Sequence, residues 1–213
     1  MRVKTPGIAL FLLLMIPLLF ATQRIKEKDL PQKYQDWLKL TKYIILNQEK
    51  DVFLQLTTDY ERDLFIESFW KQRDPTPGTP ENEYKEELTK RFLYANENFK
   101  RGSSREGWMT DMGRIYIILG PPVSIDRFPS GLDIYPCEVW SYYGDVSKGQ
   151  PVHFSLVFFQ RGGAGEYKLY SPISAGPASI LGRGKTMDPC DHEKWENKLL
   201  VAEPALNSVR SSM

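Results

Sequence analysis

The chain has 213 residues, 13% of them aromatic, and its 28 basic and 27 acidic residues leave a formal net charge of +1. An aromatic content this high is typical of a packed domain and excludes a chain that is disordered throughout. A nearly neutral chain has no overall electrostatic field with which to hold nucleic acid or an anionic membrane surface, so neither is expected as a partner.

The N-terminus has the pattern of a secretory signal peptide. Two basic residues lie near the start, residues 8–20 form an apolar run, and Ala21 is a small residue suited to cleavage. The run is shorter than the ~20 residues that a membrane-spanning helix needs, and Pro17 interrupts it. We therefore expect residues 1–21 to be removed and the mature protein to be periplasmic or secreted. The alternative is an uncleaved segment that anchors the protein in a membrane.

The next part of the chain has the periodicity of helices. Apolar residues recur at helical spacing over 31–46, and residues 51–56 either continue that helix or break it. A second helix is expected from Asp59, as N-cap, to residue 72. A cluster of prolines and a glycine then ends it. A third helix is predicted to begin at Thr79 and Pro80 and to extend to Phe99.

After the loop at residues 102–104 the pattern changes to that of strands. The segment 114–119 is apolar on both faces, which is typical of a central strand. Further strands are predicted over 137–143, over 152–160, where alternate residues are apolar, and over 166–170. Helices followed by strands indicate an α+β fold, with N-terminal helices packed on one face of a mainly antiparallel sheet of about four strands. Residues 22–213 are expected to form one domain, with 171–189 irregular and a short helix over 191–201.

A pentapeptide and several blocks around it carry a family resemblance. The pentapeptide is Gly107-Trp108-Met109-Thr110-Asp111, followed by Gly113-Arg114 and by Gly120-Pro121-Pro122. In the same order along the chain lie Arg73-Asp74-Pro75, Asn82-Glu83 and Glu138-Val139-Trp140. The chain resembles the GWxTD domain family over residues 34–170, although Met112 stands where a basic residue is common. The resemblance implies an exported or envelope-associated bacterial protein and no particular reaction.

The motif itself can be interpreted in two ways. In the structural interpretation, Asp111 accepts the backbone N–H of Gly113 in an Asx-turn, Gly113 takes positive φ, and Trp108 is buried. In the functional interpretation, charged residues at the ends of elements form a cleft in which two carboxylates cleave a glycosidic bond. The residues grouped in that cleft are Arg73, Asp74, Glu83, Asp111, Arg114 and Glu138.

Other chemistries have less support, and no catalytic residue, metal or cofactor is assigned. His153 and Ser155 are expected on one face of a strand without a nucleophile motif. Cys190 and His192 could be completed only by Cys137 and His153, which lack the usual zinc spacing. Cys137 and Cys190 are predicted either to form a disulfide in an oxidising compartment or to be two free buried thiols.

These observations favour a non-enzymatic envelope module that binds a protein, peptide or glycan. The absence of a complete catalytic set in the sequence supports this, as do the tyrosines expected at the surface, Tyr135, Tyr142 and Tyr143. The alternative is a hydrolase that acts on polysaccharide or peptidoglycan through paired carboxylates.

Overall fold

A computed structural model describes residues 24–129, 135–148, 151–160 and 165–170. Outside these ranges lie the expected signal segment, the glycines at 162 and 163, the irregular segment 171–189, Cys190, His192 and the helix expected over 191–201.

Helices come first along the chain and strands follow, which confirms the predicted α+β fold. The helices are η1 (Glu27–Asp29), α1 (Gln32–Thr41), α2 (Asn47–Phe53), α3 (Asp59–Lys71), α4 (Glu83–Asn98), η2 (Gly107–Met109), α5 (Asp111–Leu119) and η3 (Val146–Lys148). The strands are β1 (Ser124–Phe128), β2 (Cys137–Tyr143), β3 (His153–Phe159) and β4 (Lys168–Leu169). They form one antiparallel sheet in the order β1-β2-β3-β4.

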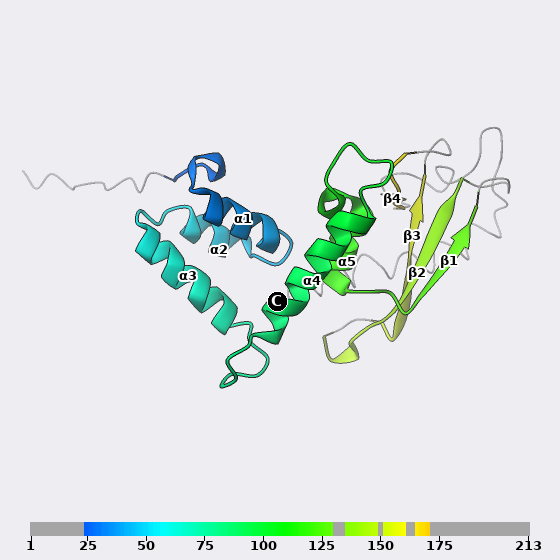
Figure 1. Ribbon diagram of the computed structural model, residues 1–213. Coiled ribbons are helices and arrows are strands. Elements are labelled where there is room, and N and C mark those ends of the chain that lie inside the picture. The colour runs from blue at the N-terminus through cyan, green and yellow to red at the C-terminus, as the bar shows by residue number, and fades with distance from the viewer. Residues whose placement is uncertain (1–23, 130–134, 149–150, 161–164, 171–213) are drawn as a thin grey trace, which may run out of the picture.

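The elements are arranged in three layers (Figure 1). Helices α1, α2 and α3 lie at one side, the sheet lies at the other, and α4 and α5 lie between them. The first core, in the helical half, contains buried residues of α1 to α5 and η2 but no strand residue among those described. The second core joins Met112 and Ile115 of α5 to five strand side chains. One face of the sheet is therefore covered by α5 and the end of α4, and not by the first three helices.

The prediction of a strand over 114–119 was wrong, because these residues belong to helix α5. The apolar side chains of α5 lie on two opposite faces, because the helix is packed between the first core and the second core. Ile117 packs into the helical core, whereas Met112 and Ile115 pack against the sheet. A short run buried on both sides has the same pattern in a helix as in a central strand. The fourth strand is instead β1, an edge strand whose residues are exposed or half-buried.

Two helix starts also differ from the predictions. Thr58, and not Asp59, is the N-cap of α3, and its side chain accepts the N–H of Glu61. Asn82, and not Thr79, is the N-cap of α4 and accepts the N–H of Lys85. The hydroxyl of Thr79 donates instead to backbone carbonyls of its own turn. Both true caps are side chains of the preferred type, so only their positions were missed.

Buried and exposed side chains alternate along β2 and the first part of β3, largely as predicted. Trp140, Tyr142, Phe154, Leu156 and Phe158 are buried on the face toward α5. Val152 was placed on the same face, but it precedes the strand and is 69% exposed. Tyr142, expected at the surface, is buried, whereas Tyr143 is 70% exposed and Tyr135 is half-buried. The opposite face carries a third small core, formed by the side chains of Cys137, Val157, Phe159 and Tyr170.

Candidate functional site

The two glycines of the motif allow three segments to approach closely. A Cβ on Gly107 would lie 2.3 Å from the carbonyl oxygen of Ala95 on α4. A Cβ on Gly113 would lie 2.0 Å from the carbonyl oxygen of Gly107. Real Cβ atoms do not make contacts this short, so side chains at these positions would push η2, α4 and α5 apart. Gly113 is helical, and the predicted positive φ at this residue was wrong.

Thr110 starts helix α5. It is 1% exposed and its hydroxyl donates to the carbonyl oxygen of Gly107 at 2.7 Å. The hydroxyl oxygen of Thr110 in turn accepts the N–H of Gly113 at 3.0 Å. The turn bond to Gly113 that was predicted for Asp111 is thus made by Thr110, as an N-cap.

Asp111 links the helix to the sheet. It is the first residue of α5, and its Oδ2 accepts the backbone N–H of Leu169 on β4 at 3.0 Å. A carboxylate at a helix N-terminus is also favoured by the helix dipole. The partner of Asp111 is therefore 58 residues away in the sequence, and local turn chemistry could not have found it.

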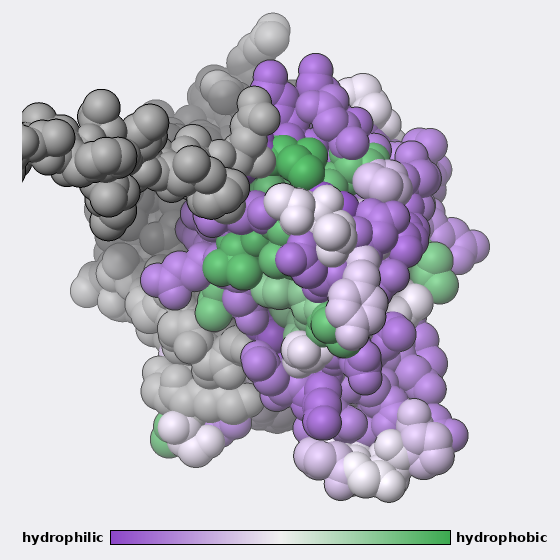
Figure 2. All heavy atoms as spheres, turned by 90° about the vertical axis from the view of Figure 1, so that its left-hand side faces the viewer, coloured by the Kyte–Doolittle hydropathy of each residue, from purple (hydrophilic) through white to green (hydrophobic). Residues whose placement is uncertain are grey.

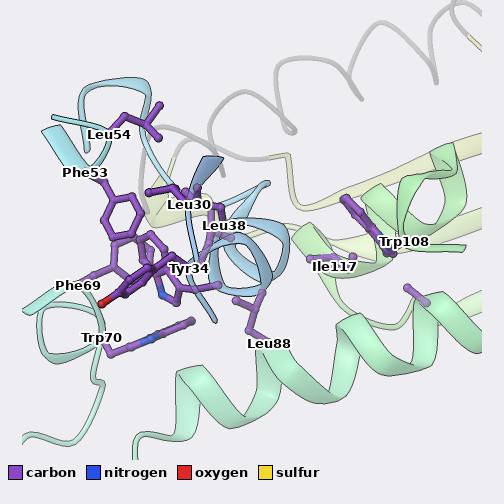
Figure 3. Close-up of a cluster of buried hydrophobic side chains, with 13 residues drawn as sticks. Leu30, Tyr34, Leu38, Phe53, Leu54, Phe69, Trp70, Leu88, Trp108 and Ile117 are labelled. Carbon is purple, nitrogen blue, oxygen red and sulfur yellow. The ribbon is translucent and has the colours of Figure 1, made fainter. Parts of the chain in front are cut away.

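Trp108 attaches the motif to the helical half. Its ring is buried at the α5 end of the helical core, in contact with Phe92 and Tyr43 (Figure 3). The indole N–H donates to Glu106, and the hydroxyl of Tyr43 donates to the carbonyl oxygen of Trp108 at 3.1 Å. The side chain of Glu106 also pairs with Lys39 on α1 at 2.7 Å. The motif thus contacts the helical half, α4, α5 and β4, and it has the geometry of a structural junction.

The charged residues grouped in the functional interpretation do not share a cavity. Arg73 lies over the ring of Phe69 and pairs with Glu49 at 2.8 Å. Asp74 accepts the N–H of Thr76 in the turn between α3 and α4. Of the six grouped residues, only Glu138 lines the cavity described below.

The remaining grouped or motif residues lie at helix ends and on α5. Glu83 is the first residue of α4, and its hydrogen bond with the side chain of Thr76 holds the pKa of its carboxyl below the usual value. Asn82 caps α4 and donates to the carbonyl oxygen of Trp70 at 2.7 Å. Arg114 is half-buried on α5.

A cavity of about 890 Å³ lies between the end of α4, helix α5 and the sheet. This volume is within the range of small-molecule and cofactor sites. Aromatic residues line it from α4, α5, β2 and the segment before β4. Charged residues line it from the segment after α4, from β1 and β2, and from the segment before β4. The aromatic residues are Tyr94, Phe99, Tyr116, Trp140 and Tyr167, and the charged residues are Arg101, Arg127, Glu138 and Glu166.

Glu138 is held at both oxygens. Oε2 accepts the indole N–H of Trp140 at 2.9 Å, and Oε1 accepts Nε of Arg127 at 3.1 Å. The two partners reach it because Trp140 lies two residues along β2, on the same face, and Arg127 is its neighbour on β1. The block that contains Glu138 and Trp140 therefore builds part of the cavity wall.

Glu166 is the second carboxylate of the cavity, and the sequence analysis missed it. It pairs with Arg105, with Lys168 at 3.0 Å, and with the hydroxyl of Ser103 at 3.2 Å. Burial acts to raise the pKa of the Glu166 carboxyl, but its hydrogen bonds with Arg105 and Lys168 outweigh this and hold the pKa below the usual value. Ser103 and Arg105 lie some 60 residues upstream, so no local pattern signals these contacts.

Of the cysteines and histidines considered in the sequence, Cys137 and His153 lie within the described residues. Cys137 is buried, and burial, followed by the charge of Glu138, raises the pKa of its thiol to about 11. Cys190 lies outside the described residues, so the bridge stays a prediction. His153 contacts the ring of Tyr143, while the hydroxyl of Ser155 lies 3.2 Å from that of Ser141. The described residues contain no group of three side chains suited to hold a metal ion.

Within the same described ranges, no helix is both long and apolar enough to cross a membrane. The comparison with family models identifies the GWxTD domain over residues 21–170. Neither a curated protein nor a solved structure matches the chain. The matched region contains every helix and strand from η1 to β4, including the junction at residues 107–111 and the whole cavity lining. The chain therefore belongs to the GWxTD domain family.

Proposed function

We propose that this protein is an exported bacterial module of the cell envelope that binds a protein, peptide or glycan and catalyses no reaction. The ligand site is the cavity between α4, α5 and the sheet. Export is supported by the N-terminal segment, with its two basic residues, the apolar run at 8–20 and the small residue Ala21.

The observation that carries the binding role is the composition of the cavity. Half-buried or exposed rings such as Tyr94, Tyr116 and Tyr167 lie beside fixed polar groups such as the Glu138–Arg127 pair. An apolar cavity with a few oriented polar groups is the usual form of a ligand site. Because the polar groups are already hydrogen-bonded to one another, the cavity is organised before a ligand arrives, which lowers the entropy lost on binding.

A hydrolase of polysaccharide or peptidoglycan is the second candidate, because Glu138 and Glu166 line the same cavity. A glycosidase needs one carboxyl that stays protonated near neutral pH, which requires a raised pKa. The pKa of Glu166 is lowered instead. Both oxygens of Glu138 already accept hydrogen bonds, from the indole N–H of Trp140 and from Arg127. The geometry therefore supports binding over hydrolysis.

The binding role is tested by co-sedimentation of the purified protein with envelope fragments from its own cells. We expect the bound fraction to fall in Tyr94→Ala, which removes a cavity ring, and to stay unchanged in Leu93→Ala. Leu93 is the matched control because it is the neighbouring residue of α4, 62% exposed, and does not line the cavity.

The same samples test the alternative. We expect no release of reducing sugar ends from the fragments. A release of reducing ends that is present in the wild type and absent in both Glu138→Gln and Glu166→Gln would establish the hydrolase and reject the binding module.

N-terminal sequencing of the protein from its own cells tests export. We expect a first residue near Thr22, and a cytoplasmic protein that retains Met1 would contradict it.

A further inference from the structure

We propose that the ligand of the cavity is a glycan, an oligosaccharide whose sugar rings lie against a wall of tyrosine and phenylalanine rings. This inference rests on the proposed binding function and narrows it to one chemical class. Three features of the cavity support it: the wall of rings, the fixed polar groups and the balance of charge.

The wall is a continuous set of rings contributed by two helices. Tyr94 of α4 and Tyr116 of α5 are stacked, with ring centroids 4.6 Å apart and an angle of 16° between planes. The ring of Phe99 lies against both, at centroid distances of 5.8 Å and 5.5 Å. Tyr94 is 46% exposed, so this part of the wall is open to a ligand. The C–H groups of a sugar ring carry partial positive charge and pack well on the negative face of such rings.

Polar side chains stand at fixed positions beside the wall. The side chain of Glu138 is 15% exposed, and its carboxylate is oriented by Trp140 and Arg127. The side chains of Asn98 and Gln160 also line the cavity. Carboxylates accept hydrogen bonds, guanidinium groups donate them, and amides do both. A sugar hydroxyl is both donor and acceptor, so it can pair with each of these groups.

The charge of the lining is balanced. Arg101 and Arg127 face the cavity together with Glu138 and Glu166. Two acids and two bases in the lining leave no excess of positive charge among these four residues to favour a polyanion such as nucleic acid or polyphosphate. A glycan satisfies the polar groups by hydrogen bonding without a large charge of its own.

A peptide fits this cavity less well than a glycan. Extended peptides usually bind by adding a strand to a free sheet edge, where their main chain is hydrogen-bonded. The sheet lines the cavity with side chains of its face, because the relevant residues are paired across the ladders, Ile125 with Trp140, Arg127 with Glu138 and Trp140 with Leu156. A peptide in this cavity would lie against side chains of the sheet face and would not extend the sheet as an added strand.

The test uses the protein purified from its own cells on two arrays. One carries neutral, amino-sugar and uronic-acid oligosaccharides, and the other carries proline-rich, aromatic and charged peptides. We expect saturable binding to oligosaccharides. The affinity should fall about tenfold in Tyr94→Ala, which loses one ring contact. It should stay within about twofold of the wild type in Tyr94→Phe, which keeps the ring, and in Leu93→Ala.

The outcomes separate this inference from the proposed function. Binding to peptides alone, weakened by Tyr94→Ala, would overturn the glycan and leave the binding module. Cleavage of a bound oligosaccharide would support the glycan and overturn the non-enzymatic function. Glycan binding that Tyr94→Ala does not change would overturn this cavity as the site. Binding on neither array would overturn both proposals.

Discussion

Charged side chains have different surroundings in the helical half, around α1 to α3, and in the sheet half, around β1 to β4. In the helical half, buried arginines are enclosed by acids and rings. Arg62 is 4% exposed, bonds to Asp59 and lies over the ring of Tyr34. Arg73 is paired in the same way with Glu49 and the ring of Phe69. The outer face of this half is mostly hydrophilic, with a small apolar group near its centre (Figure 2).

In the sheet half, charged groups and rings line an open cavity instead. Arg127 pairs with Glu138 at the cavity, yet its side chain is 67% exposed. A buried ion pair enclosed by a core has no surface to offer a ligand, whereas an oriented pair at the wall of a cavity does. Under the proposed function, the helical half contributes stability and the sheet half contributes recognition. The motif at residues 107–111 lies between them and belongs to the structural framework.

The largest effect is expected for Gly113→Ala, which tests the junction. In an ordinary helix, replacing Gly by Ala stabilises by about 1 kcal/mol. Here the added Cβ would lie 2.0 Å from the carbonyl oxygen of Gly107. We expect a loss of about 3 kcal/mol in the free energy of unfolding, measured with urea.

The control for this variant is Gly78→Ala. A Cβ there meets nothing within 4 Å, and only the positive φ of 116° opposes it. We expect a loss of about 1 kcal/mol. A Gly113→Ala protein as stable as the wild type would show that η2 and α5 are not held together as described.

The next effect is expected for Thr110→Val, which keeps the shape of the side chain and removes the hydroxyl. It leaves the N–H of Gly113 unpaired in a buried site and removes one of the two hydrogen bonds that the carbonyl oxygen of Gly107 accepts. We expect a loss of about 2 kcal/mol by urea unfolding. Thr58→Val removes an exposed cap of α3 and should cost about 1 kcal/mol. Equal losses in the two variants would contradict the burial of the junction.

Asp111→Ala is expected to lower the free energy of unfolding by about 1–2 kcal/mol, because it removes the charged acceptor of the Leu169 N–H. Asp111→Asn keeps one amide oxygen as acceptor and should lose less. Thermal and urea unfolding provide the measurement. Unchanged stability together with lost ligand binding would instead move Asp111 from the framework to the binding site.

The smallest effect concerns the pH dependence of Glu166. Its carboxyl has a pKa lowered from 4.5 in the folded protein, so its stabilisation is present above that ordinary value and is lost as pH falls through the folded pKa. We expect the melting temperature of wild type to exceed that of Glu166→Gln at neutral pH. The difference should shrink as the pH falls below about 4.5. A difference that is constant with pH would exclude the ion pairs with Arg105 and Lys168 as its source.

The parts of the fold that could be predicted from sequence were those with long, one-sided patterns. Helices α1 and α4 have apolar stripes, and β2 and the first part of β3 alternate, because each of these segments buries one face more than the other. Helix α5 has nine residues and is buried on both sides, so its period was hidden. β1 was missed because it is a polar edge strand.

The candidate site was harder to predict for a related reason. Glu138 and Trp140 stood out because they belong to a recognisable block. Glu166 reaches the cavity through packing between segments distant in the sequence, which no local pattern records. Asp111 was singled out as part of the motif, but its partner on β4 depends on how α5 docks on the sheet.

The central claim is that residues 107–111 and the start of α5 form a rigid junction and not a mobile binding loop. Native-state hydrogen exchange, followed amide by amide with NMR, tests it most directly. The N–H groups of Gly113 and Arg114 are bonded to the side chain and carbonyl of Thr110. The account predicts that both exchange only through global unfolding, as slowly as the amides of β2 and β3. Exchange of Gly113 and Arg114 as fast as that of the exposed turn around Gly78 would contradict it.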